Sequence, residues 1–235
     1  MNLSVVPDTE YQIRNLYPKK QTSVAEYTRP MSAAPVGTRE ISRHAVRAEL
    51  ARVAFNRFCL TGFNQVTFTD LSEAAGVSRS TFLRYFGTKE DVVLFVFDPV
   101  GDVITDALDA ERANQDDWSR LRNALESAVR FLVRDVQELV TILGLIEQTP
   151  ALCARLREKQ AEWRPEIVAR LQKTTSTTDG SSVIANVRVA AALEILWIVL
   201  GRWSASDGQE DLGKLLDAAF AAFSTPARQQ TDAPL

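Results

Sequence analysis

Apolar and polar residues recur with the period of α-helices over most of the chain. From Arg39 onward, apolar positions lie three and four residues apart, as they do on the buried face of an amphipathic helix. This pattern predicts a first helix over residues 39–62, two short helices over residues 67–76 and 78–86, and a fourth that starts at Lys89. The sequence shows no segment with the strict alternation of a β-strand, and no internal repeat.

Capping residues set the limits of the short helices. Thr67 followed by Asp70 resembles a capping box, with Asp in the place where Glu is usual. Gly76 is expected to end that helix, Ser78 can cap the next one, and Thr88 can cap the fourth. The sequence therefore predicts two short helices that are joined by a tight glycine turn.

The second half of the chain contains longer helical segments. They cover residues 116–135, 136–148, 149–173, 183–204 and 211–223. Thr149 and Pro150 are expected at the cap and first position of the third segment, and Pro165 is expected to end or bend it. Pro99 is expected at the end, or at a kink, of the helix that starts at Lys89.

We therefore expect an all-α fold in four parts. Residues 1–38 contain four prolines and no sustained pattern, which is typical of a disordered arm. Residues 39–90 form the domain of short helices, residues 91–224 form a larger helical domain, and residues 225–235 form a flexible tail. Met31 is a second candidate start of translation, so the sequence leaves open where the protein begins.

Charge is distributed unevenly between these parts. The whole chain has 27 Lys and Arg against 30 Asp and Glu, a net charge of -3. Residues 39–90 contain eight basic and five acidic residues, which gives +3, so the remainder of the chain carries -6. A basic segment on an acidic body is expected when that segment binds a polyanion.

The composition argues against several classes of protein. Cys59 and Cys153 are too few for a disulfide framework and favour the cytoplasm. His44 is the only histidine, and metal-binding or phosphate-loop motifs are absent from the sequence, so we expect no enzyme, no metal and no cofactor. The most apolar stretch, residues 189–201, is shorter than the roughly 20 residues of a membrane span and contains Glu194, so no membrane is expected.

The glycine-linked pair of helices has the pattern of a helix-turn-helix, whose second helix enters the major groove of DNA. On that helix Val77, Phe82 and Phe86 share a face that can pack on Leu71 and Ala75. The opposite face carries the groups that can contact bases, namely Arg79, Ser80, Leu83 and Arg84. Tyr85 and Lys89 follow at the exit of the helix, where they can reach phosphates.

The stretch TFTDLSEAAGVSRSTFLRYFGTKEDVV, residues 67–93, closely resembles the DNA-binding signature of TetR-type transcriptional repressors. The resemblance implies that Thr67 caps and contacts a phosphate, that Arg79 and Ser80 read bases, and that Tyr85 and Lys89 bind the backbone. Together with the helix-turn-helix geometry, it gives the candidate DNA contacts Thr67, Ser78, Arg79, Ser80, Thr81, Leu83, Arg84, Tyr85 and Lys89. Ser80 and Leu83 depart from the family, which commonly has Gly and Tyr there.

The resemblance also implies a small effector that releases the DNA, and the apolar pattern of the last helices predicts a homodimer that binds a palindromic operator. Residues 183–204 are apolar almost all round, and the last helix has a wide apolar face, so both can pair with a second copy. Two recognition helices about 34–36 Å apart would then read successive major grooves. The candidate dimer contacts are Ala191, Glu194, Ile195, Ile198, Leu216 and Phe220. A simply buried central helix is the alternative.

The middle helices are expected to surround the effector, which the sequence predicts to be apolar or aromatic. The candidate pocket residues are Phe131, Leu145, Glu147, Trp163 and Trp197. A helical protein–protein adaptor without specific DNA binding is the alternative function, although an adaptor does not need Arg79 and Arg84 on an exposed helix. The sequence does not distinguish an activator from a repressor.

Overall fold

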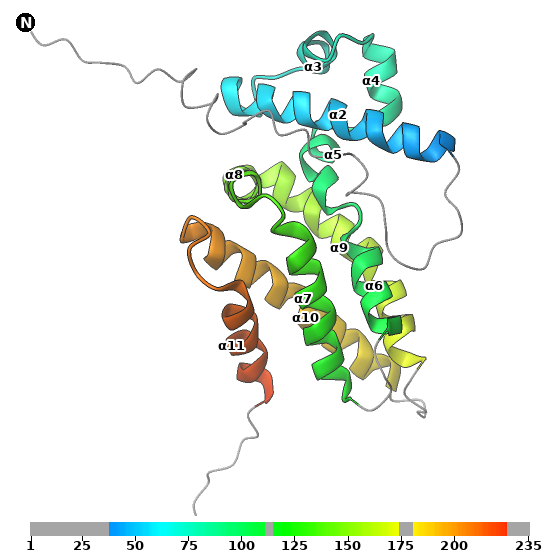
Figure 1. Cartoon of the computed structure of the whole chain (residues 1–235), viewed down its shortest axis with the longest axis vertical. Helices are drawn as coiled ribbons and strands as arrows, with labels where there is room; N and C mark the ends of the chain where they lie inside the picture. Colours follow the sequence, from blue (N-terminus) through cyan, green and yellow to red (C-terminus); the bar gives the residue numbers. More distant parts are fainter. Residues whose placement is uncertain (1–37, 111–114, 174–180, 225–235) are drawn as a thin grey trace, which may run out of the picture.

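The computed structural model describes residues 38–110, 115–173 and 181–224, and its regular secondary structure in these ranges is helical (Figure 1). The expected N-terminal arm and C-terminal tail lie outside the described residues, apart from residue 38. The helices are α2 (Thr38–Thr61), α3 (Phe68–Ala74), α4 (Arg79–Tyr85), α5 (Lys89–Val93), the 3-10 helix η2 (Leu94–Phe97), α6 (Val100–Ala110), α7 (Asp117–Leu132), α8 (Val136–Gln148), α9 (Pro150–Gln172), α10 (Ser181–Ala205) and α11 (Leu212–Ser224). The all-α prediction is confirmed.

Two elements differ from the sequence pattern. The helix that starts at Lys89 ends after a few residues, and α6 is a separate helix that begins at Val100, just after Pro99. Helix α9 continues through Pro165 to Gln172, so the helix does not end at this proline. Proline removes only one hydrogen-bond donor, and burial of the apolar residues beyond it, Ile167, Val168 and Leu171, keeps the helix intact.

Helices α2 to α4 form the unit that was predicted from residues 39–90. Helix α2 lies between the pair α3 and α4 on one side and the remaining helices on the other (Figure 1). Its buried residues Leu50, Ala54 and Phe58 follow at four-residue intervals and so form one face. Phe82 of α4 and Leu71 of α3 are fully buried, as the shared-face pattern predicted.

Helix α10 lies at the centre of the larger unit, which we call the body (residues 98–224). It packs on α7, α8, α9 and α11. By length and composition alone, residues 182–205 could cross a membrane. The stretch considered in the sequence, residues 189–201, underestimated the length of this apolar helix. In the structure its buried residues, among them Val189, Leu196 and Leu200, face neighbouring helices of the same chain.

One buried arginine joins three helix ends in the body. Arg120 of α7 is only 1% exposed. Its guanidinium donates hydrogen bonds to the carbonyl of Leu171, at 3.3 Å, and to the carbonyl of Leu108, at 3.2 Å. These carbonyls belong to the last turns of α9 and α6, where a positive charge also complements the helix dipole. Asp117, 3.7 Å away, adds a carboxylate partner, so the charge is buried with compensation.

Two glycines in helix interiors should respond oppositely to alanine. A Cβ at Gly101 of α6 would lie 2.6 Å from Cδ1 of Trp163, whereas a Cβ at Gly144 of α8 would meet no atom within 4 Å. We expect Gly101→Ala to lower the free energy of unfolding by about 1–3 kcal/mol through overpacking. Gly144→Ala should raise it by about 0.5–1 kcal/mol by restricting the unfolded chain. Urea denaturation measures both, and a destabilised Gly144→Ala or an unchanged Gly101→Ala would contradict this packing.

Candidate DNA-binding surface

The start of α3 is fixed by a reciprocal capping box. The backbone N–H of Thr67 donates to a carboxylate oxygen of Asp70 at 2.8 Å, and the backbone N–H of Asp70 donates to the Thr67 hydroxyl oxygen at 3.2 Å. The Thr67 hydroxyl also donates to the same carboxylate, at 2.7 Å. These bonds hold the pKa of Asp70 below its ordinary value. The predicted cap is confirmed, and the exposed Thr67 lies at the edge of the helix pair.

The turn between α3 and α4 depends on a left-handed glycine. Gly76 has φ of +66°, a conformation that L side chains rarely adopt. Its backbone N–H donates to the carbonyl of Glu73 at 3.1 Å, and the N–H of Val77 donates to the carbonyl of Ser72 at 3.0 Å. These bonds satisfy the last carbonyls of α3 and set where α4 begins.

Helix α4 presents its polar residues to solvent and its aromatic residues to the core. The Ser78 hydroxyl caps the helix by accepting the backbone N–H of Thr81 at 3.1 Å. Phe82 has no exposed surface, and the ring of Phe86, 1% exposed, lies 5.7 Å from that of Phe82. Of the other predicted DNA contacts on this helix, some are exposed (Arg79, Ser80 and Arg84) and some are half-buried (Thr81, Leu83 and Tyr85).

The side chain of Lys89, a predicted phosphate contact, is bound within its own chain. Its ammonium donates hydrogen bonds to the carbonyl of Phe63, at 3.0 Å, and to the carbonyl of Val66, at 2.8 Å. It also lies 4.8 Å from the centre of the Phe63 ring. The lysine therefore holds the α2–α3 turn against α5, which favours a structural role over a phosphate contact. Side-chain periodicity could not show these distant carbonyls.

A basic hollow lies beside α4, and the sequence-based list of DNA contacts omitted most of it. The hollow has a volume of about 540 Å³, and its lining residues are Arg39, Ser42, Arg43, Val46, Arg84 and Tyr85. None of the three arginines has an ion-pair partner within the part of the chain that the structure describes. The four-residue spacing of Arg39 and Arg43 at the start of α2 is the signal that could have identified this site.

Comparison with known proteins identifies the family to which this chain belongs. A family model described as bacterial regulatory proteins, tetR family, matches residues 50–96, and one described as the MftR C-terminal domain matches residues 115–227. The putative mycofactocin biosynthesis transcriptional regulator MftR of Mycobacterium tuberculosis is 32% identical over 139 residues, which cover 55% of this chain and 67% of MftR. The chain belongs to the TetR family of transcriptional regulators. It is therefore a DNA-binding regulator of transcription and not an enzyme.

Other transcriptional regulators resemble this chain in sequence or in fold. The HTH-type transcriptional regulator TcmR of Streptomyces glaucescens is 28% identical over 134 residues, and the match spans 54% of this chain and 58% of TcmR. The repressor FadR of Thermus thermophilus, solved in complex with lauroyl-CoA, superposes with a TM-score of 0.50 at 21% identity, over 80% of this chain and 98% of FadR. NalD of Pseudomonas aeruginosa superposes at 0.52 and 17% identity, over 77% and 96% of the two chains. These structures share the fold.

The residues predicted to line an effector pocket lie at different places in this TetR-family body. Trp163 packs against Gly101, and the ring of Trp197 lies 5.3 Å from that of Phe97, so both tryptophans contact one short segment, residues 97–101. Phe131 lines a separate cavity of about 10 Å³, and Leu145 is a half-buried residue packed on the core. Glu147 is exposed, which corrects its assignment to the wall, because burying an unpaired carboxylate is costly.

Some of the predicted dimer contacts are buried within the single chain, and others are exposed. Ile195, Leu216 and Phe220 are at most 4% exposed within a single chain, so they cannot lie on a free surface. Ile198 is 61% exposed, and Glu194 is also exposed. They continue a stripe of α10 that comprises Ile184, Val187, Ala191, Glu194 and Ile198. A helix that is apolar almost all round does not reveal from its sequence which face its own chain covers, and this explains the three misassigned residues.

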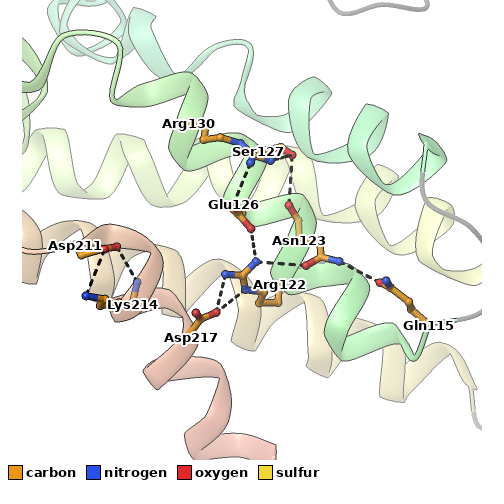
Figure 2. Close-up of polar contacts among 9 residues, drawn as sticks. All are labelled: Gln115, Arg122, Asn123, Glu126, Ser127, Arg130, Asp211, Lys214 and Asp217. Carbon is orange, nitrogen blue, oxygen red and sulfur yellow. Dashed lines mark hydrogen bonds and ion pairs between the residues drawn. The ribbon is translucent and has the colours of Figure 1, made fainter.

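Helix α11 is held beside this stripe by α7 of the same chain. Figure 2 shows Arg122 of α7 between Asp217 of α11, at 2.6 Å, and Glu126 one turn along α7. The Trp118 indole N–H donates to the carbonyl of Phe220 at 3.2 Å, and the two rings lie 4.5 Å apart. These contacts fix the position of α11 relative to α7. The exposed surface that α10 and α11 form together is therefore held in one arrangement.

We found no group of three His, Cys, Asp or Glu side chains that could hold a metal ion in the described ranges 38–110, 115–173 and 181–224. The two cysteines are free thiols, with Cys59 exposed and Cys153 half-buried.

Lys89→Met should affect stability rather than DNA contact. Two carbonyls lose their charged donor, so we expect the free energy of unfolding to fall by about 1–3 kcal/mol in urea denaturation. The salt dependence of binding to nonspecific duplex DNA should keep its slope, whereas loss of a phosphate contact would reduce that slope by about 1. Lys214→Met, at a lysine that is 85% exposed, is the control and should change stability by less than about 0.5 kcal/mol. A reduced salt slope with unchanged stability would instead support Lys89 as a phosphate contact.

Proposed function

We propose that this protein is a cytoplasmic repressor that binds a palindromic operator as a homodimer and releases it when a small apolar effector binds the body. In this proposal residues 39–90 read DNA, and residues 91–224 bind the effector and the second subunit. The border between them, at residue 90, falls inside α5, so the two units share a helix rather than a linker.

The exposed polar face of α4 is the observation that carries the DNA-binding part of the proposal. Arg79 lies at the first position of this helix, where side chains of a recognition helix contact base edges. Arginine can pair with the O6 and N7 atoms of guanine, and the Ser80 hydroxyl can serve either bases or phosphates. Arg84 and Tyr85 continue this face into the basic hollow, which is therefore suited to the sugar-phosphate backbone next to the groove.

The α10 stripe supports the homodimer. Its residues Ile184, Val187 and Ile198 are 53–62% exposed, and water would cover this apolar surface if the chain were alone. A two-fold axis lets the same stripe serve both subunits, because an isologous contact uses one self-complementary surface. Helix α11, which packs on α10, completes a four-helix contact between two copies.

The two tryptophans that contact residues 97–101 support an effector site in the body. The indole N–H of Trp197 is buried without a hydrogen-bond partner within the described residues. It can donate to an oxygen of an effector that is otherwise apolar, which would remove the cost of an unpaired donor. A repressor named FadR was solved with lauroyl-CoA, which shows that this fold can hold a ligand with a long apolar part. For release, the effector must bind the DNA-free conformation more tightly than the DNA-bound one.

Selection of binding sites from random duplex DNA tests the regulator against the adaptor alternative. We expect a palindrome whose half-sites lie one helical turn apart, about 34–36 Å. Arg79→Ala together with Arg84→Ala should weaken binding to it by about 10- to 100-fold per lost bidentate contact and relax its sequence preference. Fluorescence anisotropy measures the affinities, and the selected duplexes can then be screened with small molecules for release. Binding without a preferred sequence would favour the adaptor.

The same assay separates base contacts from backbone contacts. Arg39→Ala with Arg43→Ala should weaken binding equally for all sequences and reduce the salt slope by about 2 if each arginine binds one phosphate. Arg157→Ala with Arg164→Ala removes the same charge from exposed positions of α9 and is the control. An equal effect of the two pairs would mean that only the net charge matters.

Ile198→Asp should convert the protein into a monomer, because two buried carboxylates would face each other across the two-fold axis. Analytical ultracentrifugation measures the mass, and operator affinity should fall with the loss of the dimer. Leu60→Asp, at a residue of α2 that is 55% exposed, is the control and should leave the dimer intact. A wild-type monomer at micromolar concentration, or a dimeric Ile198→Asp variant, would refute this interface.

A further inference from the structure

Two cations of α9 hold the segment that leads from the recognition helix into the body. Arg155 pairs with Asp91 at 2.9 Å, and Lys159, one helical turn later, pairs with Asp98 at 2.5 Å. Asp91 lies in α5, and Asp98 directly follows η2. The two ion pairs therefore attach both ends of the α5–η2 segment to a single helix of the body.

Asp98 also reaches the DNA-binding helices. Its second carboxylate oxygen forms an ion pair with the guanidinium of Arg47 of α2, at 2.8 Å. The guanidinium of Arg47 lies over two aromatic rings that contact each other, 4.9 Å from the centre of Phe86 and 5.0 Å from the centre of Phe95. Phe86 is the residue that ends the recognition helix, because its backbone N–H donates to the carbonyl of Phe82. A continuous series of contacts thus runs from Lys159 through Asp98 and Arg47 to the end of α4.

The side chains of this series are partly buried. Lys159 is 9% exposed, and the side chains of Asp98 and Arg47 are 23% and 31% exposed. Ion pairs at such positions are screened less by salt than pairs on an open surface. Removing one member leaves its partner charged and partly desolvated, so the remaining side chains should rearrange.

We propose that Lys159, Asp98 and Arg47 are positioning residues that set the orientation of the recognition helix relative to the body. None of them needs to touch DNA for this role. With the series intact, α4 is held in the orientation that can bind DNA. Without it, that orientation is one of several, and the apparent affinity falls in proportion to its population. The series also gives a displacement of α9 a route to the recognition helix.

This inference rests on the proposed function, and its test uses the palindromic duplex selected with the wild-type protein. Lys159→Met in the full-length chain should weaken binding to that duplex by about tenfold, a coupling of ordinary size between distant sites. Lys159→Arg retains the charge and should restore binding close to that of the wild type. Lys159→Gln is a second neutral variant in case the Met variant does not fold, and circular dichroism with thermal unfolding reports the folded fraction of each.

A double-mutant cycle distinguishes a series of contacts from independent effects on stability. If Lys159 acts through Asp98, then Asp98→Asn with Lys159→Met should bind no more weakly than Asp98→Asn alone. Arg170 is the control, because this α9 arginine also pairs with an aspartate, Asp109 of α6, but that pair lies within the body. Arg170→Met should leave DNA affinity unchanged.

Each outcome decides one claim. Failure of the wild-type protein to select any duplex rejects the proposed function. A wild type that binds, with neutral Lys159 variants of equal affinity, rejects the positioning role. Additive losses in the double variant, or an equal loss in Arg170→Met, also reject it. A tenfold loss that Arg restores and that disappears in the Asp98→Asn background supports it.

Discussion

The DNA-binding unit is built from helices that are too short to be stable alone. Helices α3 and α4 have seven residues each and α5 has five, whereas isolated helices need roughly 12–15 residues even to be marginal in water. Their stability must come from capping bonds and from the apolar face against α2. The aromatic contacts of that face run from Phe68 through Phe82 and Phe86 to Phe95. Since Phe95 lies in η2, the packing that forms the recognition helix also joins it to the body.

Local signals in the sequence predicted this unit well. Thr67, Ser78 and Thr88 are the caps that the residue types indicated, and Gly76 has the left-handed conformation expected of the turn. Each of these features depends on residues within four positions along the chain, and short-range rules therefore suffice. The three- and four-residue spacing of apolar residues likewise located most helices of the body.

Features that depend on distant parts of the chain were not predictable. The carbonyl partners of Lys89 lie 23 and 26 residues away, and the carbonyl partners of Arg120 lie 12 and 51 residues away. The covered face of α10 depends on where four other helices lie, and its own composition is too uniform to reveal it. The continuous path of α9 through Pro165 has the same origin, because tertiary packing outweighs the local preference for a break.

Arginines at four-residue intervals along α2 have two different environments. Arg39 and Arg43 line the hollow without ion-pair partners within the described residues, whereas Arg47 lies over two aromatic rings and is paired with Asp98. The change occurs over a single turn, where the helix passes from the open surface to the junction with the body. Three arginines of one helix thus have two roles: Arg39 and Arg43 are available to a polyanion, whereas Arg47 stabilises the fold.

Asp91 combines two roles that are usually carried by different residues. One carboxylate oxygen accepts the backbone N–H of Thr88 and completes the cap of α5, and the other accepts a hydrogen bond from Arg155 of α9. A replacement that preserves only the cap loses the bond to α9, and one that preserves only the charge loses the cap. During sequence divergence, positions 88, 91 and 155 are therefore expected to change together, although 64 residues separate the last two.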